Sequence, residues 1–421
     1  MEFLASDAMN GRASGSRDEW IAATYVAAHL RRLGLEPLGD DGGYVQRIDI
    51  ERPEFGAPPV LTIGGRRFTH GKELAVAGMP RPALSGPLVR HTKGTPAPRG
   101  SVVLIDEPFR TLSTDLASAA LVLGKPDVCG PPSRIVRERL PRLATRTVGT
   151  PPPPPRPVCV ALDAEPFAFV EKQPAGVRVS LEGEVKGSVT SNTWNAVGQI
   201  RGSDPARARE VILLSAHIDH VGVRPNVPAG GDAINNGADD DASGSVAVLE
   251  LAEAMARGPR PKRTIVFAWF GSEETGGAGS RYFADKPVVP LDRIVANLQF
   301  EMIGRPDPKV PAHTLWLTGY ERSDLGPALA KRGAKLVQDP HPEQDFFQRS
   351  DNIQFALRGV IAHTVSSYGL HKEYHTPEDE IEKVDFAHMT DAIQSMLGPV
   401  RWLANATFKP AWNPGGRPGS Q

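Results

Sequence analysis

Two adjacent acidic residues, Glu273 and Glu274, follow the apolar run 264–270 and open a glycine-rich turn. A strand that delivers such a pair at its C-terminal end can place one carboxylate on a metal ion. The neighbouring carboxylate can then accept a proton from a water that the metal activates. The pair therefore predicts one metal ligand and one general base.

A second candidate stands where another apolar run ends. The run 211–216 leads into His217, and Asp219 follows two residues later. An imidazole bound to a metal usually donates its other ring N–H to a carboxylate or a carbonyl, which fixes the tautomer and raises the basicity of the ligating nitrogen. We therefore predict His217 as a ligand and Asp219 as the carboxylate that orients it.

Three consecutive aspartates, residues 239–241, precede a helical pattern over 246–255. Their charges repel one another, and the partial positive charge of a helix N-terminus offsets only part of that repulsion. A cation among the carboxylates would offset the rest. Asp240 is the ligand candidate in this triplet.

The last two candidates are Glu301, directly after the apolar run 294–300, and His375, on a loop ahead of Pro377. The full set of predicted ligands is His217, Asp240, Glu274, Glu301 and His375. Nitrogen and oxygen donors without a thiolate suit zinc at a catalytic site. Five side chains are too many for one tetrahedral ion with an open position, so we predict two zinc ions that share a carboxylate.

Other arrangements of histidine are less compatible with a metal. His371 and His375 stand four residues apart, but a single-zinc protease helix needs Glu directly after the first His, where this chain has Lys372. We expect ordinary hydrogen-bonded or solvated imidazoles at four further positions, His220, His313, His341 and His363.

In their order along the chain, these segments resemble the aminopeptidase Y family of dinuclear zinc exopeptidases. The matching motifs are His-x-Asp, Gly-Ala-Asp-Asp-Asp-Ala-Ser-Gly, Glu-Glu, Glu-Met-Ile-Gly-Arg and Tyr-His-Thr-Pro, between residues 215 and 377. The family also contains glutamate carboxypeptidase II, and glutaminyl cyclases and the transferrin receptor are similar to it. Residues 3–12 also resemble the opening segment of this family.

The resemblance implies a role for each residue. One zinc is held by His217, Asp240 and Glu301, and a second by Asp240, Glu274 and His375. Asp240 bridges the ions and is followed by a cis peptide bond, Glu273 is the general base, and Asp219 is the partner of His217. Many members carry Asp where this chain has Glu301, and a longer side chain can still reach the ion.

The implied activity is that of an aminopeptidase, in which one ion polarises the peptide carbonyl and the other holds the free amine of the substrate. A carboxypeptidase or dipeptidase with the same two-zinc site is the alternative. A silent, receptor-like binding module is a third possibility, but all five ligands are present, which counts against it. The preferred side chain cannot be read from the sequence.

Strands and helices that alternate after about residue 191 predict an α/β fold, with a mostly parallel, mixed sheet between helices. The family resemblance implies that this sheet is of the zinc-peptidase (phosphorylase/hydrolase-like) type. A capping box at Ser16 and Glu19 predicts an opening helix. We expect a helical N-terminal segment over 1–50, an inserted β-rich lid of the protease-associated type over 51–190, the catalytic domain over 191–408, and a disordered tail over 409–421. The closing helix should begin near Asp385 and be kinked or interrupted at Pro399.

Composition excludes several classes of protein. The 421 residues carry 48 Lys and Arg against 49 Asp and Glu, so no strong field attracts nucleic acid, and no apolar run is long enough to span a membrane. We expect a peptide substrate as the partner. Cys129 and Cys159 permit one disulfide. The family-like opening favours a secreted or periplasmic protein whose leader has been removed, with a cytoplasmic one as the alternative.

Overall fold

The computed structural model describes residues 1–129, 140–149, 157–224 and 227–419. The chain divides into two compact units. Unit 1 comprises Met1–Asp49, Asn192–Pro342 and Phe346–Gln421, and unit 2 comprises Ile50–Ser191 with Glu343–Asp345. The chain leaves unit 1 within strand β2 (Val45–Phe55) and returns within β14 (Val185–Ile200).

Unit 1 is built on a mixed sheet in which neighbouring strands follow the order β2-β14-β16-β15-β17-β20-β18-β19, with β1 (Glu36–Pro37) paired to β14. The remaining strands of unit 1 are β15 (Val211–His217), β16 (Thr264–Phe270), β17 (Ile294–Phe300), β18 (Leu315–Leu317), β19 (Leu336–Gln338) and β20 (Ala362–Ser366). The four central strands, β16, β15, β17 and β20, are mutually parallel, whereas β14 runs antiparallel to β16 and β18 runs antiparallel to β20.

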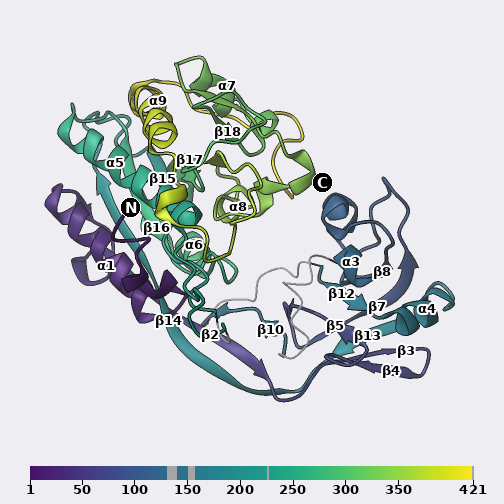
Figure 1. Ribbon diagram of the computed structural model, residues 1–421. Coiled ribbons are helices and arrows are strands. Elements are labelled where there is room, and N and C mark those ends of the chain that lie inside the picture. The colour runs from purple at the N-terminus through teal and green to yellow at the C-terminus, as the bar shows by residue number, and fades with distance from the viewer. Residues whose placement is uncertain (130–139, 150–156, 225–226, 420–421) are drawn as a thin grey trace. The chain divides into compact units, whose positions relative to one another are not determined.

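Helices lie on both faces of this sheet (Figure 1). The helices of unit 1 are α1 (Arg17–Arg32), α5 (Gly244–Arg257), α6 (Ala278–Asp285), α7 (Leu325–Ala330), α8 (Asn352–Ala356) and α9 (Phe386–Asn405). Along β16, Phe267 and Trp269 belong to the core beneath α1, α5 and α9, while Phe270 belongs to the core beneath α6 and α8. Because the strands are buried on both faces, they read as continuous apolar runs. The predicted α/β fold class is confirmed.

Unit 2 contains an eight-stranded sheet in the order β4-β3-β13-β7-β8-β9-β12-β5, and a separate two-stranded pair, β10 with β6. Its strands are β3 (Val60–Ile63), β4 (Arg66–Thr69), β5 (Leu74–Ala75), β6 (Gly78–Met79), β7 (Ala83–Arg90), β8 (Val102–Leu104), β9 (Leu121–Gly124), β10 (Arg142–Leu143), β11 (Arg146–Thr147), β12 (Cys159–Leu162) and β13 (Arg178–Glu182). Its helices are α2 (Ser113–Leu116), α3 (Pro126–Cys129) and α4 (Ala164–Glu171). A disulfide joins Cys129 and Cys159. The role of this β-rich unit as a lid stays a prediction.

The predictions for two helices of unit 1 have different outcomes in the structure. Helix α9 continues through Pro399 without interruption, because Met396, Val400 and Leu403 are all buried in the core on the same side and hold both halves in one helix. The opening helix α1 begins as predicted, with the Ser16 side chain accepting a hydrogen bond from the N–H of Glu19.

The C-terminal tail, expected to be disordered over 409–421, is ordered in its described part, up to residue 419. The Trp412 indole lies against Phe347 and His363 and donates to the carbonyl of Gly359 (3.2 Å). The N–H of Asn413 donates to the carbonyl of Arg322 (2.8 Å). Contacts of the partly buried Trp412 ring hold this part of the tail against unit 1 despite its glycines and prolines.

Candidate metal centre

Three predicted ligand segments follow neighbouring parallel strands of the unit 1 sheet. His217 is the last residue of β15, Glu273 and Glu274 follow β16, and Glu301 follows β17. Because parallel strands present their carboxyl ends at one edge, these side chains lie on the same edge of the sheet. The cis peptide bond between Asp240 and Asp241 lies in the turn Ala238–Ser243 that enters α5.

The buried carboxylate of Asp240 lies between two imidazoles, those of His217 and His375. Its Oδ1 is 3.1 Å from Nε2 of His217, and its Oδ2 is 3.0 Å from Nε2 of His375. Nε2 of His375 is also 3.0 Å from Oε2 of Glu274. The structure thus brings four of the five predicted ligands into one cluster around Asp240.

His220, which the sequence analysis set aside, also lies in this cluster. Its Nδ1 is 2.9 Å from Oε1 of Glu274 and 3.8 Å from Oδ2 of Asp240. The sequence analysis expected an ordinary hydrogen-bonded or solvated imidazole at this position, and the contact with Glu274 is compatible with a hydrogen bond, but the place of His220 among the predicted ligands was not expected. The available sequence signal was its place three residues after His217, on the segment that leaves the strand end.

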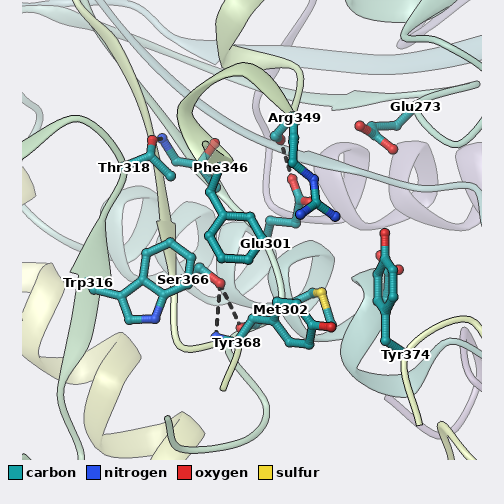
Figure 2. A pocket seen from close by; sticks show the side chains of 13 residues that line it. Glu273, Glu301, Met302, Trp316, Thr318, Phe346, Arg349, Ser366, Tyr368 and Tyr374 are labelled. Atoms are coloured by element: carbon teal, nitrogen blue, oxygen red, sulfur yellow. Dashed lines mark hydrogen bonds between the residues drawn. The ribbon is translucent and has the colours of Figure 1, made fainter. Parts of the chain in front are cut away.

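Glu301, the fifth predicted ligand, is outside the tightest clusters of donor atoms in the described residues. It lines a pocket together with Asp240 and Glu273 (Figure 2). The hydroxyl of Ser350 donates to Oε2 of Glu301. Glu301 therefore stands at the edge of the cluster, toward the pocket.

Asp219 has a different contact from the one predicted. Nδ1 of His217 is 3.1 Å from the carbonyl oxygen of Asp219 and 3.7 Å from its carboxylate. The carboxylate accepts hydrogen bonds from the backbone N–H groups of Glu273 (2.9 Å) and Glu274 (3.3 Å) and from the Ser14 hydroxyl. Asp219 thus orients the imidazole through its backbone and the paired glutamates through its side chain.

The charges of the cluster compensate one another as ion pairs. Burial alone would lower the pKa of His375, but Glu274 and Asp240 raise it to about 10. Burial would raise the pKa of Glu274, but His375 and His220 hold it at about 2. His217 likewise has a pKa well above its usual range, because Asp241, Asp219 and Asp240 outweigh its burial. Protons on these imidazoles occupy the place that a cation would take, so metal binding must release them.

The carboxylates nearer the pocket favour the protonated form. Burial raises the pKa of Glu273 well above its usual range, and the neighbouring Glu301 and Glu274 raise it further, although His217 opposes this. Burial also raises the pKa of Glu301 to about 7, and that of Asp351 to about 7. These groups would regain ordinary acidity next to a cation.

The directions of the donor atoms fit a metal ion. Among the described residues, Nε2 of His217 and Nε2 of His375 are buried without a hydrogen-bond partner, although each lies close to a carboxylate. Donors that converge on a common point, instead of on each other's lone pairs, suit a shared cation. Two groups of donor atoms close enough for one ion are present in the described chain: His220, Asp240, Glu274 and His375; and His217, Glu273 and Glu274.

An N-terminal residue outside the predicted site holds the ligand loops in place. The buried guanidinium of Arg12 donates to the carbonyl oxygens of Ile218 (3.0 Å), Gly237 (2.8 Å) and Leu4 (2.8 Å). These contacts join the His217 loop to the Asp240 loop. Arg12 appeared in the sequence only as part of the family-like opening, and no local pattern indicated this role.

Glu19, in the first turn of α1, supports the other side of the site. Its buried carboxylate accepts hydrogen bonds from the N–H of Ser272 (2.9 Å) and from the Thr193 hydroxyl (2.7 Å). Ser272 directly precedes the Glu273–Glu274 pair and has a φ of 58°. The N-terminal segment is therefore part of the framework that positions the glutamates.

The pocket beside the cluster has aromatic walls. Trp316 and Phe346 stack at 5.3 Å between ring centroids, and Tyr368 packs against Phe346 (Figure 2). Arg349 also lines the pocket, with its guanidinium over the Phe346 ring at 4.8 Å. The pocket thus offers apolar surface for a side chain directly next to the acidic groups.

The fold and this site together define an α/β domain with a two-part candidate metal centre at the carboxyl edge of its sheet. The family model of peptidase family M28 matches residues 195–398 of this chain. This range includes all five predicted ligands but excludes Arg12 and Glu19.

Individual relatives agree with this assignment. Leupeptin-inactivating enzyme 1 of Streptomyces exfoliatus is 34% identical over 136 residues, which cover 32% of this chain and 27% of the relative. The probable lipoprotein aminopeptidase LpqL of Mycobacterium tuberculosis is 24% identical over 83% of this chain and 68% of its own length. This chain covers 19% to 32% of the first five curated relatives that it matches.

Two solved structures share the fold over nearly the whole chain. The aminopeptidase from Aneurinibacillus sp. strain AM-1 matches with a TM-score of 0.55 at 20% identity, covering 97% of this chain and 93% of that one. The zinc aminopeptidase BSAP from Bacillus subtilis matches with a TM-score of 0.51 at 21% identity, covering 96% and 93%. The described residues contain no helix that is long and apolar enough to cross a membrane.

Proposed function

We propose that this protein is a zinc-dependent aminopeptidase that removes the N-terminal residue of peptides. The observation that carries the proposal is the convergence of His217, His375 and Glu274 on the buried carboxylate of Asp240, with Glu273 beside them. Relatives named as aminopeptidases, one of them as a zinc enzyme, support it.

In this proposal His217, Asp240 and Glu301 hold one zinc ion, and Asp240, Glu274 and His375 hold the second. The donors are nitrogen and carboxylate oxygen without thiolate, which is the set that catalytic zinc prefers. When bound, zinc would acidify a water molecule and polarise the carbonyl of the peptide bond.

The residues of the chain supply the proton transfers and the positioning. Asp219 fixes the backbone of Glu273 through a 2.9 Å hydrogen bond, and the Glu273 carboxylate lines the pocket. From there Glu273 accepts the proton of the attacking water and returns it to the leaving amine. The carbonyl of Asp219 accepts the Nδ1–H of His217 and leaves Nε2 free to bind metal.

The pocket gives the expected direction of the substrate. The aromatic rings of Trp316, Phe346 and Tyr368 would take an apolar first side chain, and the carboxylates of Glu273 and Glu301 line the same pocket, where their oxygens can accept hydrogen bonds from a free N-terminal amine. We therefore expect peptides with an apolar N-terminal residue as substrates.

A carboxypeptidase or dipeptidase is the second candidate, because one observation favours it. Arg349 lines the pocket, and a guanidinium can bind a terminal carboxylate in a bidentate manner. Its stacking on Phe346 also explains its position without a substrate carboxylate.

The direct test combines metal analysis with three forms of one tripeptide that begins with leucine. We expect two zinc ions per chain and activity that a chelator removes and zinc restores. N-acetylation should lower kcat/KM by roughly 10²-fold or more, since an acetamide lacks the free amine that the proposed site binds. C-terminal amidation should have little effect. Equal rates for the free and acetylated peptides, with a large loss on amidation, would assign the protein to the carboxypeptidase branch.

Location is a separate part of the proposal. The disulfide between Cys129 and Cys159 is typical of proteins that fold outside the reducing cytoplasm. The relative named as a lipoprotein points in the same direction. We propose a secreted or periplasmic enzyme, and fractionation of the producing cells with quantification of the two thiols tests this.

A further inference from the structure

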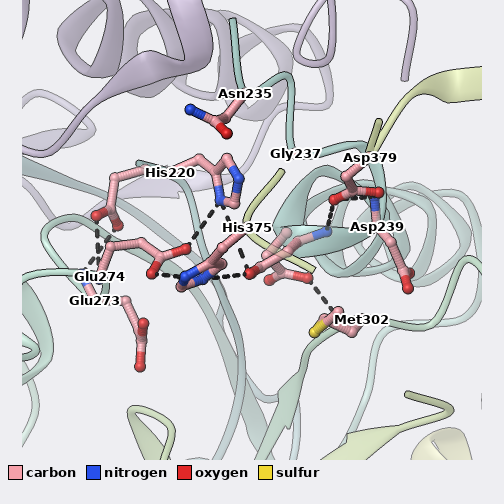
Figure 3. Close-up of polar contacts among 12 residues, drawn as sticks. His220, Asn235, Gly237, Asp239, Glu273, Glu274, Met302, His375 and Asp379 are labelled. Atoms are coloured by element: carbon pink, nitrogen blue, oxygen red, sulfur yellow. Dashed lines mark hydrogen bonds and ion pairs between the residues drawn. The ribbon is translucent and has the colours of Figure 1, made fainter. Parts of the chain in front are cut away.

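His220 faces the same point as three of the predicted ligands. Its ring is buried, and its Nδ1 lies 2.9 Å from Glu274 and 3.8 Å from Oδ2 of Asp240. His375 approaches the same two carboxylates from the other side, with its Nε2 at 3.0 Å from each. The two imidazole rings meet edge to face, with centroids 5.4 Å apart. Figure 3 shows both rings directed at the carboxylates between them.

The spacing of these four side chains matches a tetrahedral ion. Zinc bonds of about 2.0–2.2 Å to nitrogen and oxygen place neighbouring donors of a tetrahedron roughly 3.3–3.5 Å apart. The four nitrogen–oxygen separations run from 2.9 to 3.8 Å and lie on both sides of that value, with Oε1 of Glu274 toward His220 and Oε2 toward His375. One donor atom from each of the four side chains lies within 4.8 Å of the other three, which is close enough for one shared ion.

The His220 ring is fixed in this direction by its surroundings. Its backbone N–H donates to the carbonyl of Arg12 (3.1 Å). The face of the ring lies on Gly237, where a Cβ atom would come within 2.6 Å of Cγ and Cδ2 of His220. Gly237 also has a φ of 59°, so glycine is favoured there both by this positive φ and by the lack of room for a Cβ atom. The glycine therefore makes room for the imidazole next to Asp240.

We propose that His220 is a further metal ligand, through Nδ1, of the ion that Asp240, Glu274 and His375 hold. This inference rests on the proposed function, since it requires metal at the site. It makes the two halves of the centre unequal. The half with His220 has four protein ligands, like a structural zinc site, whereas the half with His217, Asp240 and Glu301 has three and keeps a position open. Two residues of this half, Asp240 and Glu301, line the pocket together with Glu273.

A hydrogen bond from Nδ1–H to Glu274 is the competing explanation of the 2.9 Å contact. In that case His220 would only orient Glu274, and its loss would weaken metal binding by about 10–100-fold. In the proposed case Nδ1 binds the metal and the proton is on Nε2. That atom is buried and has no hydrogen-bond partner among the described residues, so its proton should exchange slowly with water.

The test is the proton NMR spectrum of the full-length protein loaded with Co²⁺ at both sites. Each ligating imidazole contributes one exchangeable, strongly shifted N–H signal. We expect signals from His217, His220 and His375 in the wild type, and loss of one of them in His220→Gln, together with a drop in the affinity for the second Co²⁺ of more than about 100-fold. The matched control is His341→Gln, which removes a buried imidazole 2.8 Å from the Asp307 carboxylate and should leave all three signals in place.

Each result is decisive. Only two imidazole signals in the wild type would overturn the proposal, and this measurement does not depend on whether His220→Gln folds. Three signals that persist in a folded His220→Gln protein would also overturn it. Failure of the wild type to bind two metal ions would instead contradict the proposed function, and the two failures are thus distinguishable by metal analysis of the wild type alone.

Discussion

The two oxygens of the Asp240 carboxylate have different surroundings. On the side of Oδ2, His375 lies at 3.0 Å and His220 at 3.8 Å, and both imidazoles also contact Glu274, at 3.0 and 2.9 Å. On the side of Oδ1, His217 is the close partner at 3.1 Å, and Asp240 also lines the pocket together with Glu273 and Glu301. One shared carboxylate therefore connects a crowded half, suited to holding an ion, with an open half, suited to chemistry.

The difference shows how a single cluster can combine retention of metal with reactivity. Four protein ligands around one ion stabilise it but leave no coordination position for a substrate. Three protein ligands leave one coordination position open, and other groups must then orient and shield the molecule that binds there. The aromatic walls and the fixed Glu273 backbone supply that function on the open side. The predictions below test whether the two halves differ in this way.

The largest effect is expected from the residue that both halves share. Asp240→Ala should lose both metal ions and lower kcat/KM by more than about 10³-fold, because each ion loses a ligand and the bridge between them. Metal content after dialysis and the rate with a leucyl peptide measure this. The control is Asp239→Asn, whose carboxylate faces His371 (2.9 Å) and the N–H of Gly304 (2.7 Å) instead. Retention of two ions in Asp240→Ala would exclude a bridging role.

A smaller effect, confined to the open half, is expected for Glu273→Gln. The variant should keep a normal metal content but lose about 10²–10⁴-fold in kcat, since the proton acceptor is removed and the ligands remain. The exposed Glu382→Gln variant should behave as the wild type in both measurements. Loss of metal from Glu273→Gln would show instead that Glu273 is a ligand, as its closeness to His217 and Glu274 also permits.

The smallest effect concerns the stability of the fold at acid pH. Acidification also releases metal, so the two effects of pH must be separated before the two halves of the metal centre can be compared. His363 is fully buried, and burial lowers its pKa to about 4. Its Nδ1–H donates to the Thr318 carbonyl (2.8 Å), and its Nε2 accepts from the Ser323 hydroxyl (2.7 Å). The folded protein thus favours neutral His363, and the corresponding stability is complete above the unfolded pKa near 6.5 and decreases as the pH falls toward 4.

The measurement is the free energy of unfolding in urea at pH 7.5 and pH 4.5, for the wild type and His363→Gln. A shift from 6.5 to about 4 corresponds to about 3 kcal/mol, so the wild type should lose up to that amount more than the variant on acidification. Other titrating groups are common to both proteins and cancel in the difference. Parallel losses in the two proteins would contradict a depressed pKa at His363.

Much of the site was predictable because its chemistry depends on local patterns. The runs 211–216, 264–270 and 294–300 end where β15, β16 and β17 end, within one residue. Parallel strands carry their carboxyl ends to a common edge, so the acid or imidazole after each run had to lie near the others. The ligand candidates could therefore be proposed from residue type and position alone.

At Pro399 and in the C-terminal tail, tertiary packing outweighs the local preference of the sequence. Pro399 lacks a backbone N–H and predicts a break, yet the buried residues on either side keep α9 continuous. The glycines and prolines of the tail predict disorder, yet Trp412 anchors it. In both cases the free energy gained by burying apolar surface outweighs a local conformational preference. Such a preference contributes only about 1–3 kcal/mol per residue.

The sequence by itself determined the α/β class, the strand ends and the identities of the five predicted ligands, because strand periodicity and the chemistry of His, Asp and Glu are local properties. Only the tertiary structure decided that His220 joins Glu274, that the Asp219 carboxylate holds the glutamate pair, and that Arg12 connects two ligand loops. These contacts join residues that are about 50 to more than 200 positions apart. Folding brings these distant residues together, and no local pattern in the sequence predicts their contacts.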